Sequence, residues 1–276
     1  KAALGAKVDG VLVGLDHPIT TDISLALLTP PRGKAACDPD VLWLLRHSAA
    51  HVMAEAVQTI YPQAQLVYGP PVEDGFYYDI AMADGTAIST DDFEKIEAKM
   101  DEIIKADKPF TRCDTSIEDG MARLEQEGSK YKIDNARRAV ESGADSLSWY
   151  ATGESGTDWD DLCRGPHVPS TGRLGGFKLM SVAASHWHGD VESDSLTRLY
   201  GTAFPDRKRL AAHLEQLEEA KKRDHRVIGK QLGLFRIDEM VGQGLVLWTP
   251  AGAVIRQQLQ DFIAAELARQ GYDQVF

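Results

Sequence analysis

The sequence of 276 residues lacks the features that would assign it to a membrane or secreted class of protein. No apolar run approaches the roughly 20 residues that a membrane-spanning helix needs. The first residues, which include Lys1 and Lys7, have no apolar core of a secretion signal. We therefore expect a cytoplasmic location and no association with a membrane.

The chain also has few cysteines and no net positive charge. The three cysteines, Cys37, Cys113 and Cys163, are odd in number and far apart, which excludes a recognisable disulfide framework and fits a reducing compartment. The formal net charge of −12 argues against a protein that coats nucleic acid by bulk attraction. Residues 205–236 differ, because they hold nine basic residues against five acidic ones. This stretch is either a solvated helix face or a face that contacts phosphates.

Apolar periodicity and turn residues predict a chain of mixed helices and strands in more than one domain. Short strands and turns are expected over 7–28, and Pro30, Pro31 and Gly33 suggest a boundary. Helices are expected at 39–60 (capped by Asp38), from 93 to before 109, at 116–126, 132–141, 206–232 and 251–269. Strands are expected at 65–68, 75–82, 146–150, 177–184 and 245–248, with a hairpin turn at 84–85 and a long polar loop over 158–172.

Two spacings suggest a reaction centre: His47-x-x-x-His51 on the first long helix, and Cys163-x-x-x-His167 in the polar loop. A spacing of four places both imidazoles on one face of a helix, and this face points away from the apolar stripe, which argues against a core role. Three imidazoles and one thiolate would make a tetrahedral zinc set. The same groups could line a metal-free pocket that orients a water. Asp161 could support a histidine, bind a water or lie in solvent.

Six motifs follow one another along the chain: Arg46-His-Ser-Ala-Ala-His51, Gly75-Phe-Tyr-Tyr-Asp79, Cys163-Arg-Gly-Pro-His167, Phe177-Lys-Leu-Met180, Tyr200-Gly-Thr-Ala203, and Lys222-Arg-Asp-His-Arg226 with Ile228-Gly-Lys-Gln-Leu232. In order and spacing they resemble the pattern of the threonyl-tRNA synthetases. Together these matches cover nearly the whole chain. Alanyl-tRNA synthetases have a similar editing module but do not share the connector.

The resemblance implies an α+β, multi-domain organisation. Residues 1–35 would be part of a TGS domain, a small β-grasp module, and 36–204 an editing domain of the threonyl/alanyl-tRNA synthetase type. Residues 205–236 would form a connector helix, and 237–276 the start of the class II antiparallel-sheet catalytic domain, through its motif 1 helix. Motifs 2 and 3, which bind ATP, and the zinc site that holds threonine are expected outside this chain.

The resemblance also implies an activity: threonine–tRNA ligation by the full-length enzyme, and hydrolysis of mischarged seryl-tRNA(Thr) by this region. ATP, Mg²⁺ and Zn²⁺ would be cofactors of the full-length enzyme. Its partners would be tRNA(Thr), threonine, mischarged serine and a second copy of itself in a homodimer. The alternatives are a freestanding or alanyl-type trans-editing deacylase, and a non-catalytic tRNA-binding module.

The family's editing residues fall on His47, His51, Lys132, Asp161, Cys163 and His167, with Tyr78 near the terminal adenosine. His47 and Lys132 would position the hydrolytic water and polarise the ester, and Asp161 would hold the seryl amine or hydroxyl. His51, Cys163 and His167 would shape the pocket. Without the resemblance, Lys132 would be taken for a solvated helix residue and Tyr78 for a packing residue.

Two points stay open at the level of sequence. The family's editing site generally works without a metal, which favours the metal-free alternative, with His47, His51, Cys163 and His167 as the zinc candidates. Where the family commonly has an aromatic residue followed by Trp-Arg-Gly-Asp, this chain has His186-Trp187-His188-Gly189-Asp190. An imidazole in place of a permanent cation weakens any phosphate contact at neutral pH, so we assign that loop no role in tRNA binding.

Overall fold

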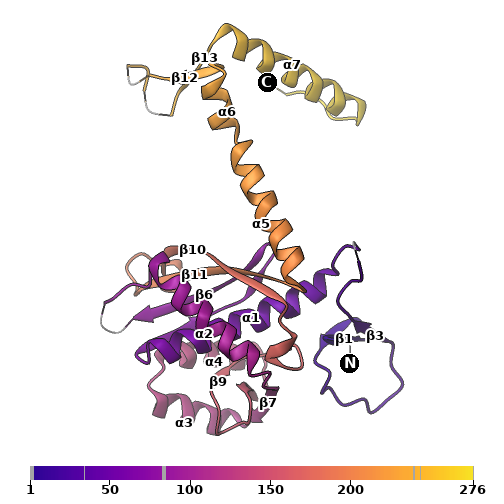
Figure 1. The fold of residues 1–276 in the computed structure, drawn as a ribbon, viewed down its shortest axis with the longest axis vertical. Helices are drawn as coiled ribbons and strands as arrows, with labels where there is room; N and C mark the ends of the chain where they lie inside the picture. Colours follow the sequence, from indigo (N-terminus) through magenta and orange to yellow (C-terminus); the bar gives the residue numbers. More distant parts are fainter. Residues whose placement is uncertain (1–2, 34, 83–84, 239, 243, 276) are drawn as a thin grey trace. The chain divides into compact units, whose positions relative to one another are not determined.

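The computed structural model describes residues 3–33, 35–82, 85–238, 240–242 and 244–275. The chain divides into two compact units, Lys1–Leu210 and Ala211–Phe276. The larger unit contains two antiparallel sheets with helices packed against them and a small sheet near the N-terminus (Figure 1).

The main sheet of the larger unit carries helix α1 (Pro39–Ile60) on one face. The helix begins where the sequence predicts, because the Asp38 side chain accepts a hydrogen bond from the Asp40 N–H and Pro39 opens the first turn. The strand order is β10-β11-β6-β4, and β5 pairs with β6. These strands are β4 (Ala64–Tyr68), β5 (Pro71–Val72), β6 (Gly75–Met82), β10 (Gly176–His186) and β11 (Ser195–Phe204).

One hydrophobic core lies between α1, the main sheet and helix α2 (Phe93–Lys105). Its large, fully buried members are Leu44, Leu45 and Met53 of α1, Phe76 and Ile80 of β6, Leu199 of β11, and Ile96 and Met100 of α2. Ser89 and Asp92 form a reciprocal capping interaction in a short 3-10 turn (Thr90–Asp92) ahead of α2. The hairpin turn predicted at 84–85 falls partly outside the described residues.

The second sheet has the order β7-β8-β9, with strands β7 (Phe110–Thr115), β8 (Leu147–Thr152) and β9 (Asp160–Leu162). Helices α3 (Ile117–Glu127) and α4 (Lys130–Glu141) contribute Leu124 and Ala136 to a separate core with Leu147 and Trp149 of β8. The predicted interruption between these helices is confirmed, because α3 ends at Gly128 with a left-handed φ of 68°.

Several strands escaped the sequence analysis. The loop predicted over 158–172 is wrong in part, because β9 occupies three of its residues and a 3-10 turn begins at Thr171. The strand β9 satisfies its backbone by pairing with β8, with Asp161 opposite Tyr150. The sequence analysis also missed β7 and β11. Such polar or mixed segments show little period-two apolar alternation, so only their long-range partners define them as strands.

The first strands, β1 (Gly5–Val8), β2 (Val11–Val13) and β3 (Leu25–Leu28), form a three-stranded antiparallel sheet of order β2-β1-β3. Asp9 and Gly10 form the turn between β1 and β2, with positive φ angles at both residues, within the 7–28 stretch where short strands and turns are expected. Leu4 and Leu28 join the core that contains α1, so this small sheet has an apolar contact with the rest of the larger unit.

The smaller unit begins within α5 (Arg207–Lys222), because the first turn of this helix belongs to the larger unit. Besides the rest of α5, the smaller unit contains α6 (His225–Gln231), the paired strands β12 (Phe235–Ile237) and β13 (Val246–Trp248), and α7 (Pro250–Arg269). The single helix predicted over 206–232 is wrong. The chain leaves the helix after Lys222, and the Asp224 side chain then accepts a hydrogen bond from the Arg226 N–H and caps a new helix.

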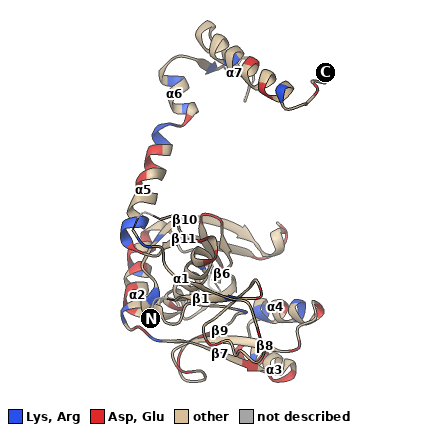
Figure 2. Ribbon diagram, turned by 90° about the vertical axis from the view of Figure 1, so that its right-hand side faces the viewer, with Lys and Arg blue, Asp and Glu red and all other residues tan. Residues whose placement is uncertain are grey.

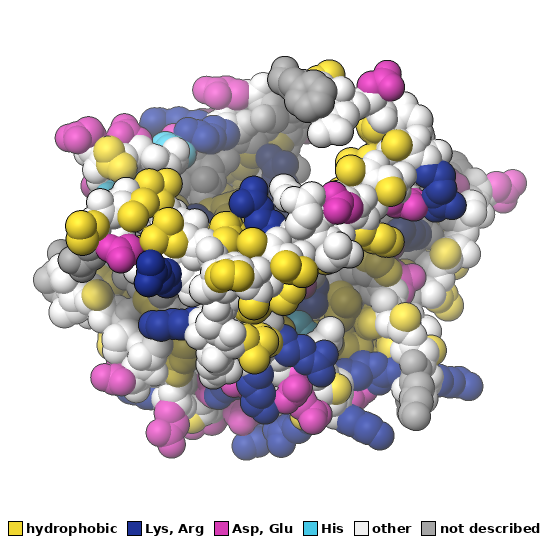
Figure 3. Space-filling model, turned by 90° about the horizontal axis from the view of Figure 1, so that it is seen from above, with side chains coloured by type: hydrophobic (Ala, Val, Ile, Leu, Met, Phe, Trp, Pro, Cys, Tyr) yellow, Lys and Arg dark blue, Asp and Glu magenta, His cyan; other side chains and the backbone are white. Residues whose placement is uncertain are grey.

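The surface of the smaller unit is mixed in charge and partly apolar. Basic residues on α5 alternate with acidic ones (Figure 2), and Lys221 and Lys222 pair with glutamates one turn earlier. These pairs within one helix favour the solvated-face interpretation of the basic stretch. Large apolar side chains of α7, among them Leu259 and Phe262, are more than half exposed, and Figure 3 shows exposed hydrophobic side chains among charged ones.

No helix among the described residues is both long and apolar enough to span a bilayer. All three cysteines are free, which agrees with the absence of a disulfide framework predicted from their number and spacing.

Glu55 on α1 is a half-buried carboxyl group inside the larger unit. Burial raises its pKa to about 7, and the nearby Lys108 offsets this only in part. The folded chain therefore binds more protons than the unfolded chain between the ordinary pKa of 4.5 and pH 7. The contribution of Glu55 to the stability of the fold is therefore present at low pH and is lost as the pH rises through 7.

We expect Glu55→Gln to stabilise the chain at pH 8 by about 2 kcal/mol and to change its stability little at pH 5, because the amide carries no charge to desolvate. Urea unfolding at the two pH values measures this difference. The exposed Glu125→Gln serves as the control and should have no effect at either pH. Equal unfolding free energies for Glu55→Gln and the wild type at pH 8 would contradict the assignment.

Candidate active site

His47 and His51 lie on one side of α1, as their spacing predicts, but the argument against a buried position was wrong for His51. Only 3% of its surface is exposed, because Phe110 and Trp159 pack edge-on against its ring at centroid distances of 5.5 and 4.8 Å. The side of α1 opposite the main sheet is thus covered as well. His51 Nε2 is buried and has no hydrogen-bond partner among the described residues.

The two predicted pairs meet in space. Cys163 Sγ lies 3.3 Å from His47 Nε2 and 3.3 Å from His167 Nε2. The His47 and His167 rings stack with centroids 4.3 Å apart, and the His51 ring lies 4.7 Å from His167. The segment between Asp158 and Gly172 therefore carries its thiol and imidazole to the histidines of α1, as the sequence spacing suggested.

Backbone and hydroxyl partners orient both rings that contact the thiol. His47 Nδ1 lies 3.1 Å from the Pro166 carbonyl oxygen, which can only accept, so Nδ1 carries the proton and Nε2 presents a lone pair to Cys163. Ser48 Oγ lies 3.2 Å from His167 Nδ1 and accepts a hydrogen bond from the Val168 N–H. Gly165 permits the tight loop, because its φ is +64° and an added Cβ would lie 2.2 Å from the Tyr150 hydroxyl.

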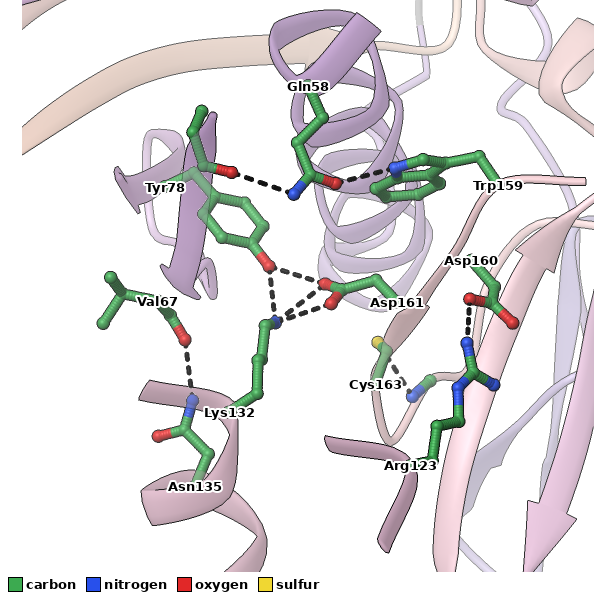
Figure 4. A network of polar contacts seen from close by, with 12 residues as sticks. Gln58, Val67, Tyr78, Arg123, Lys132, Asn135, Trp159, Asp160, Asp161 and Cys163 are labelled. Carbon is green, nitrogen blue, oxygen red and sulfur yellow. Dashed lines mark hydrogen bonds and ion pairs between the residues drawn. The ribbon is translucent and has the colours of Figure 1, made fainter. Parts of the chain in front are cut away.

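A second buried group is formed by Lys132 of α4, Tyr78 of β6 and Asp161 of β9 (Figure 4). The Tyr78 hydroxyl donates to Asp161 Oδ2 at 2.6 Å, and Lys132 Nζ donates to the Tyr78 oxygen at 2.9 Å and to Asp161 Oδ2 at 2.8 Å. The side chains of Lys132 and Asp161 are only 8% and 9% exposed. The lysine is thus not the solvated residue that its sequence context alone suggested.

Both groups border one cleft of about 800 Å³. Its lining includes six of the seven residues carried over from the family: His47, His51, Tyr78, Lys132, Asp161 and Cys163. His167 is buried behind this lining, in contact with Tyr150 and Phe110. The cleft is large enough for a small ester and an attached nucleoside.

The imidazoles next to the thiol are neutral at physiological pH. Burial lowers the pKa of His47 to about 4, and it lowers the pKa of His167 well below the usual value. Burial, reinforced by the charge of Asp161, raises the pKa of the Tyr78 hydroxyl well above its usual value, so the phenol stays a hydrogen-bond donor.

Among the described residues, His47, Cys163 and His167 form a group that could hold a metal ion, with donor atoms within 4.8 Å of one another. Both imidazoles have their second nitrogen bonded to a protein oxygen, as metal-bound histidines usually do. His51, the fourth zinc candidate from the sequence, is not part of this group. Three protein ligands would leave one coordination position open, which is the arrangement of catalytic rather than structural zinc.

The sequence analysis missed several residues of the site. Trp43 lines the cleft with its ring 4.9 Å from His47, and Ser48 orients His167. Arg198 also lines the cleft and binds Asp79 through two hydrogen bonds of 2.7 Å. The i, i+4 spacing of Trp43 and His47 was a usable signal. The pair of Arg198 and Asp79 had none, because its two residues lie on neighbouring strands that are far apart in the sequence.

The segment His186–Asp190, whose sequence departs from the pattern common in the family, contributes His186, Trp187, His188 and Gly189 to the lining of the same cleft. Trp187 packs against Tyr131 at 5.2 Å, and His188 Nε2 lies 2.9 Å from an Arg138 nitrogen and 3.1 Å from Asp134. These contacts hold the end of the β10–β11 hairpin against α4.

Comparisons with known proteins show which families the sequence is similar to. Residues 147–200 match the family described as the threonyl and alanyl tRNA synthetase second additional domain. The chain is 45% identical over 275 residues to a threonine–tRNA ligase of Anaeromyxobacter dehalogenans, and 44% identical over 276 residues to one of Nitrosococcus oceani. These matches cover the whole chain but only 40% and 41% of the relatives' lengths. The chain is thus related along its entire length to threonine–tRNA ligases, as its motifs indicate, and it spans about two fifths of such a protein.

Proposed function

We propose that this chain carries a hydrolytic editing site that cleaves the ester of seryl-tRNA(Thr), within a protein that ligates threonine to tRNA(Thr). One observation carries the proposal. The buried Lys132, Tyr78 and Asp161 group and the His47 and Cys163 pair border a single cleft, in a chain related throughout to threonine–tRNA ligases.

A second site is needed because serine differs from threonine by one methyl group. A pocket that coordinates the amine and hydroxyl of threonine gains only about 1 to 3 kcal/mol from that methyl, roughly 10 to 200-fold in rate. Hydrolysis of the wrong ester in a separate pocket supplies the remaining accuracy. That pocket must accept the seryl group and exclude or misplace the threonyl group.

The proposed reaction adds water to the ester carbonyl, breaks the bond to the ribose oxygen and leaves a proton on that oxygen. His47 is neutral at pH 7, so its ring can orient the attacking water through the lone pair of Nε2. The Lys132 ammonium polarises the carbonyl and stabilises the charge that develops on its oxygen. Asp161 has lone pairs beyond those that Lys132 and Tyr78 use, and it binds the α-ammonium of the seryl group.

The other residues act by shape and position. Cys163 and His51 line the cleft where they contact the aminoacyl group and the ribose. His167 supports the thiol from behind. Tyr78 holds Lys132 and Asp161 together beside the terminal adenosine.

The domain layout and the remaining partners belong to the same proposal. Residues 1–35 are part of a TGS module, 36–204 the editing domain, 205–236 the connector and 237–276 the start of the class II catalytic domain. The exposed apolar side chains of α7 are those expected of a motif 1 helix that packs in a homodimer of the full-length protein. ATP, Mg²⁺ and Zn²⁺ would serve the ligation reaction at sites outside this chain.

We expect His47→Ala and Lys132→Ala to lower the single-turnover rate of seryl-tRNA(Thr) hydrolysis by about 10²-fold or more, because each removes a group that acts on the reacting atoms. Binding of tRNA should persist in both variants. Lys178→Ala, which removes an exposed lysine paired with Glu97, is the matched control and should keep the wild-type rate. Unchanged hydrolysis in the first two variants would sink the assignment, and retained tRNA binding without hydrolysis in the wild type would select a binding module.

The rate should depend on pH through His47. Since the lone pair of His47 is needed and its pKa is about 4, we expect a rate that is constant between pH 6 and 7.5 and falls only below about pH 5. The measurement is the enzymatic rate after subtraction of spontaneous ester hydrolysis at each pH. A decline that begins at pH 6.5, where an ordinary histidine titrates, would show that His47 is not the group in question.

Metal removal tests the metal-free form of the proposal. We expect dialysis against a chelator to leave hydrolysis unchanged, and stoichiometric Zn²⁺ to inhibit it by occupying the nitrogen of His47 and the sulfur of Cys163. Rates before and after dialysis, together with metal analysis of the protein, decide the matter. Activity lost on chelation and restored by Zn²⁺ would favour a zinc centre at His47, Cys163 and His167.

A further inference from the structure

Two rows of side chains face each other across the site. On and beside β9, Trp159, Asp161 and Cys163 are two residues apart, so they point to the same side of the extended chain. On α1, His47, His51 and Gln58 lie within about 40° of one another around the helix axis. The proposed reaction uses His47, His51, Asp161 and Cys163 from these rows, but it does not use Trp159 or Gln58.

The rows are joined at both ends. At one end Cys163 Sγ lies 3.3 Å from His47 Nε2, and at the other the Trp159 indole Nε1–H donates to Gln58 Oε1 at 2.8 Å. Four residues of strand advance about 13 Å and eleven residues of helix about 16 Å, so the two rows have similar lengths. A hydrogen bond at the far end therefore limits sliding of β9 along α1.

Gln58 is itself fixed by a second contact. Its Nε2 donates to the carbonyl oxygen of Ala64, at the start of β4, at 3.0 Å. The indole N–H can only donate and the carbonyl can only accept, so the orientation of the Gln58 amide is determined. Gln58 thus connects α1 to both sheets. The Trp159 carbonyl also accepts the Thr152 N–H at 2.9 Å, which holds the residue to the end of β8.

The Trp159 ring has a direct contact with the site. Its centroid lies 4.8 Å from that of His51, with the rings inclined at 76°. His51 has a buried nitrogen without a partner among the described residues, so no hydrogen bond at that nitrogen sets the rotation of its ring. The packing of Trp159 and Phe110 against the ring holds it in place.

We propose that Gln58 and Trp159 are positioning residues of the editing site. Their hydrogen bond sets the register of β9 on α1, which places Asp161 beside Lys132 and Cys163 beside His47, and the indole orients His51. The inference rests on the proposed hydrolysis. It adds two residues that touch neither substrate nor reacting atoms and act through those that do. A displacement of about 1 Å at a reacting group can lower a rate by up to about 10²-fold.

The test compares Trp159→Phe, which keeps an aromatic ring but loses the N–H, with Gln58→Met, which loses the acceptor. We expect each to lower the single-turnover rate of seryl-tRNA(Thr) hydrolysis about tenfold with little change in KM. The double variant should lose no more than Gln58→Met alone, rather than a hundredfold, because Gln58→Met already breaks the bond to Trp159 along with the bond to Ala64. Tyr61→Phe is the control, since it removes a 2.6 Å hydrogen bond to Asp92 just beyond the same end of α1 without touching β9.

A second measurement does not depend on activity. In Gln58→Met, the NMR resonances of the His51 imidazole should shift, although residue 58 is not a ring neighbour of His51, and in Tyr61→Phe they should not. Single-variant effects that multiply in the double variant, or rates equal to that of Tyr61→Phe, would overturn the inference. Unshifted His51 resonances would do the same. The two proposals can fail separately. If the His51 resonances shift in Gln58→Met but the wild-type protein hydrolyses no seryl ester, the positioning role is supported and the proposed function is refuted.

Discussion

The buried ion pair between Lys132 and Asp161 is the interaction on which the architecture of the site depends. Removing two charges from water costs several kcal/mol per ion, and the pair is tolerated only when geometry and additional hydrogen bonds offset that cost. Tyr78 supplies them by donating to the carboxylate and accepting from the ammonium. The three side chains come from α4, β9 and β6, so the site is complete only when both sheets are docked on α1.

This arrangement explains why the middle of α1, residues 44–57, has no exposed residue. The main sheet covers the side that carries Leu45 and Met53, and the second sheet brings Phe110 to the side that carries His51. A helix between two layers has no solvent-facing side for polar residues, so any polar group there must be paired or functional. Ser48 meets this requirement through His167 and Val168, and Gln58 does so through Trp159 and Ala64.

Local sequence determined more of the helices than of the strands. The cap at Asp38, the glycine stop at Gly128 and the periodic apolar residues of α2 are short-range signals, and the structure has these helices within about three residues of the predicted bounds. β9 could not be predicted this way, because it is short and polar and exists through its pairing with β8. The spacing of four predicted correctly that His47 and His51 share one side of a helix. It did not predict their burial, which depends on residues more than 50 positions away. Lys132 carried no local signal, and only the resemblance to a family pointed to it.

The proposed function requires an acidic chain to accommodate an RNA end. Among the described residues, four cations line the cleft, and three of them have carboxylate partners: Lys132 pairs with Asp161 at 2.8 Å, Arg198 with Asp79 at 2.7 Å and Arg138 with Asp134 at 3.0 Å. The fourth, Arg164, is exposed and forms no ion pair with a described residue. Because paired cations contribute little to long-range attraction, most of the positive charge of the cleft does little to draw in tRNA. The cleft can recognise a terminal nucleoside and an amino acid ester by shape and directed hydrogen bonds, which depend little on salt. In the proposed function, most of the affinity for the rest of the tRNA then arises on surfaces away from this cleft, and the cleft discriminates between seryl and threonyl groups.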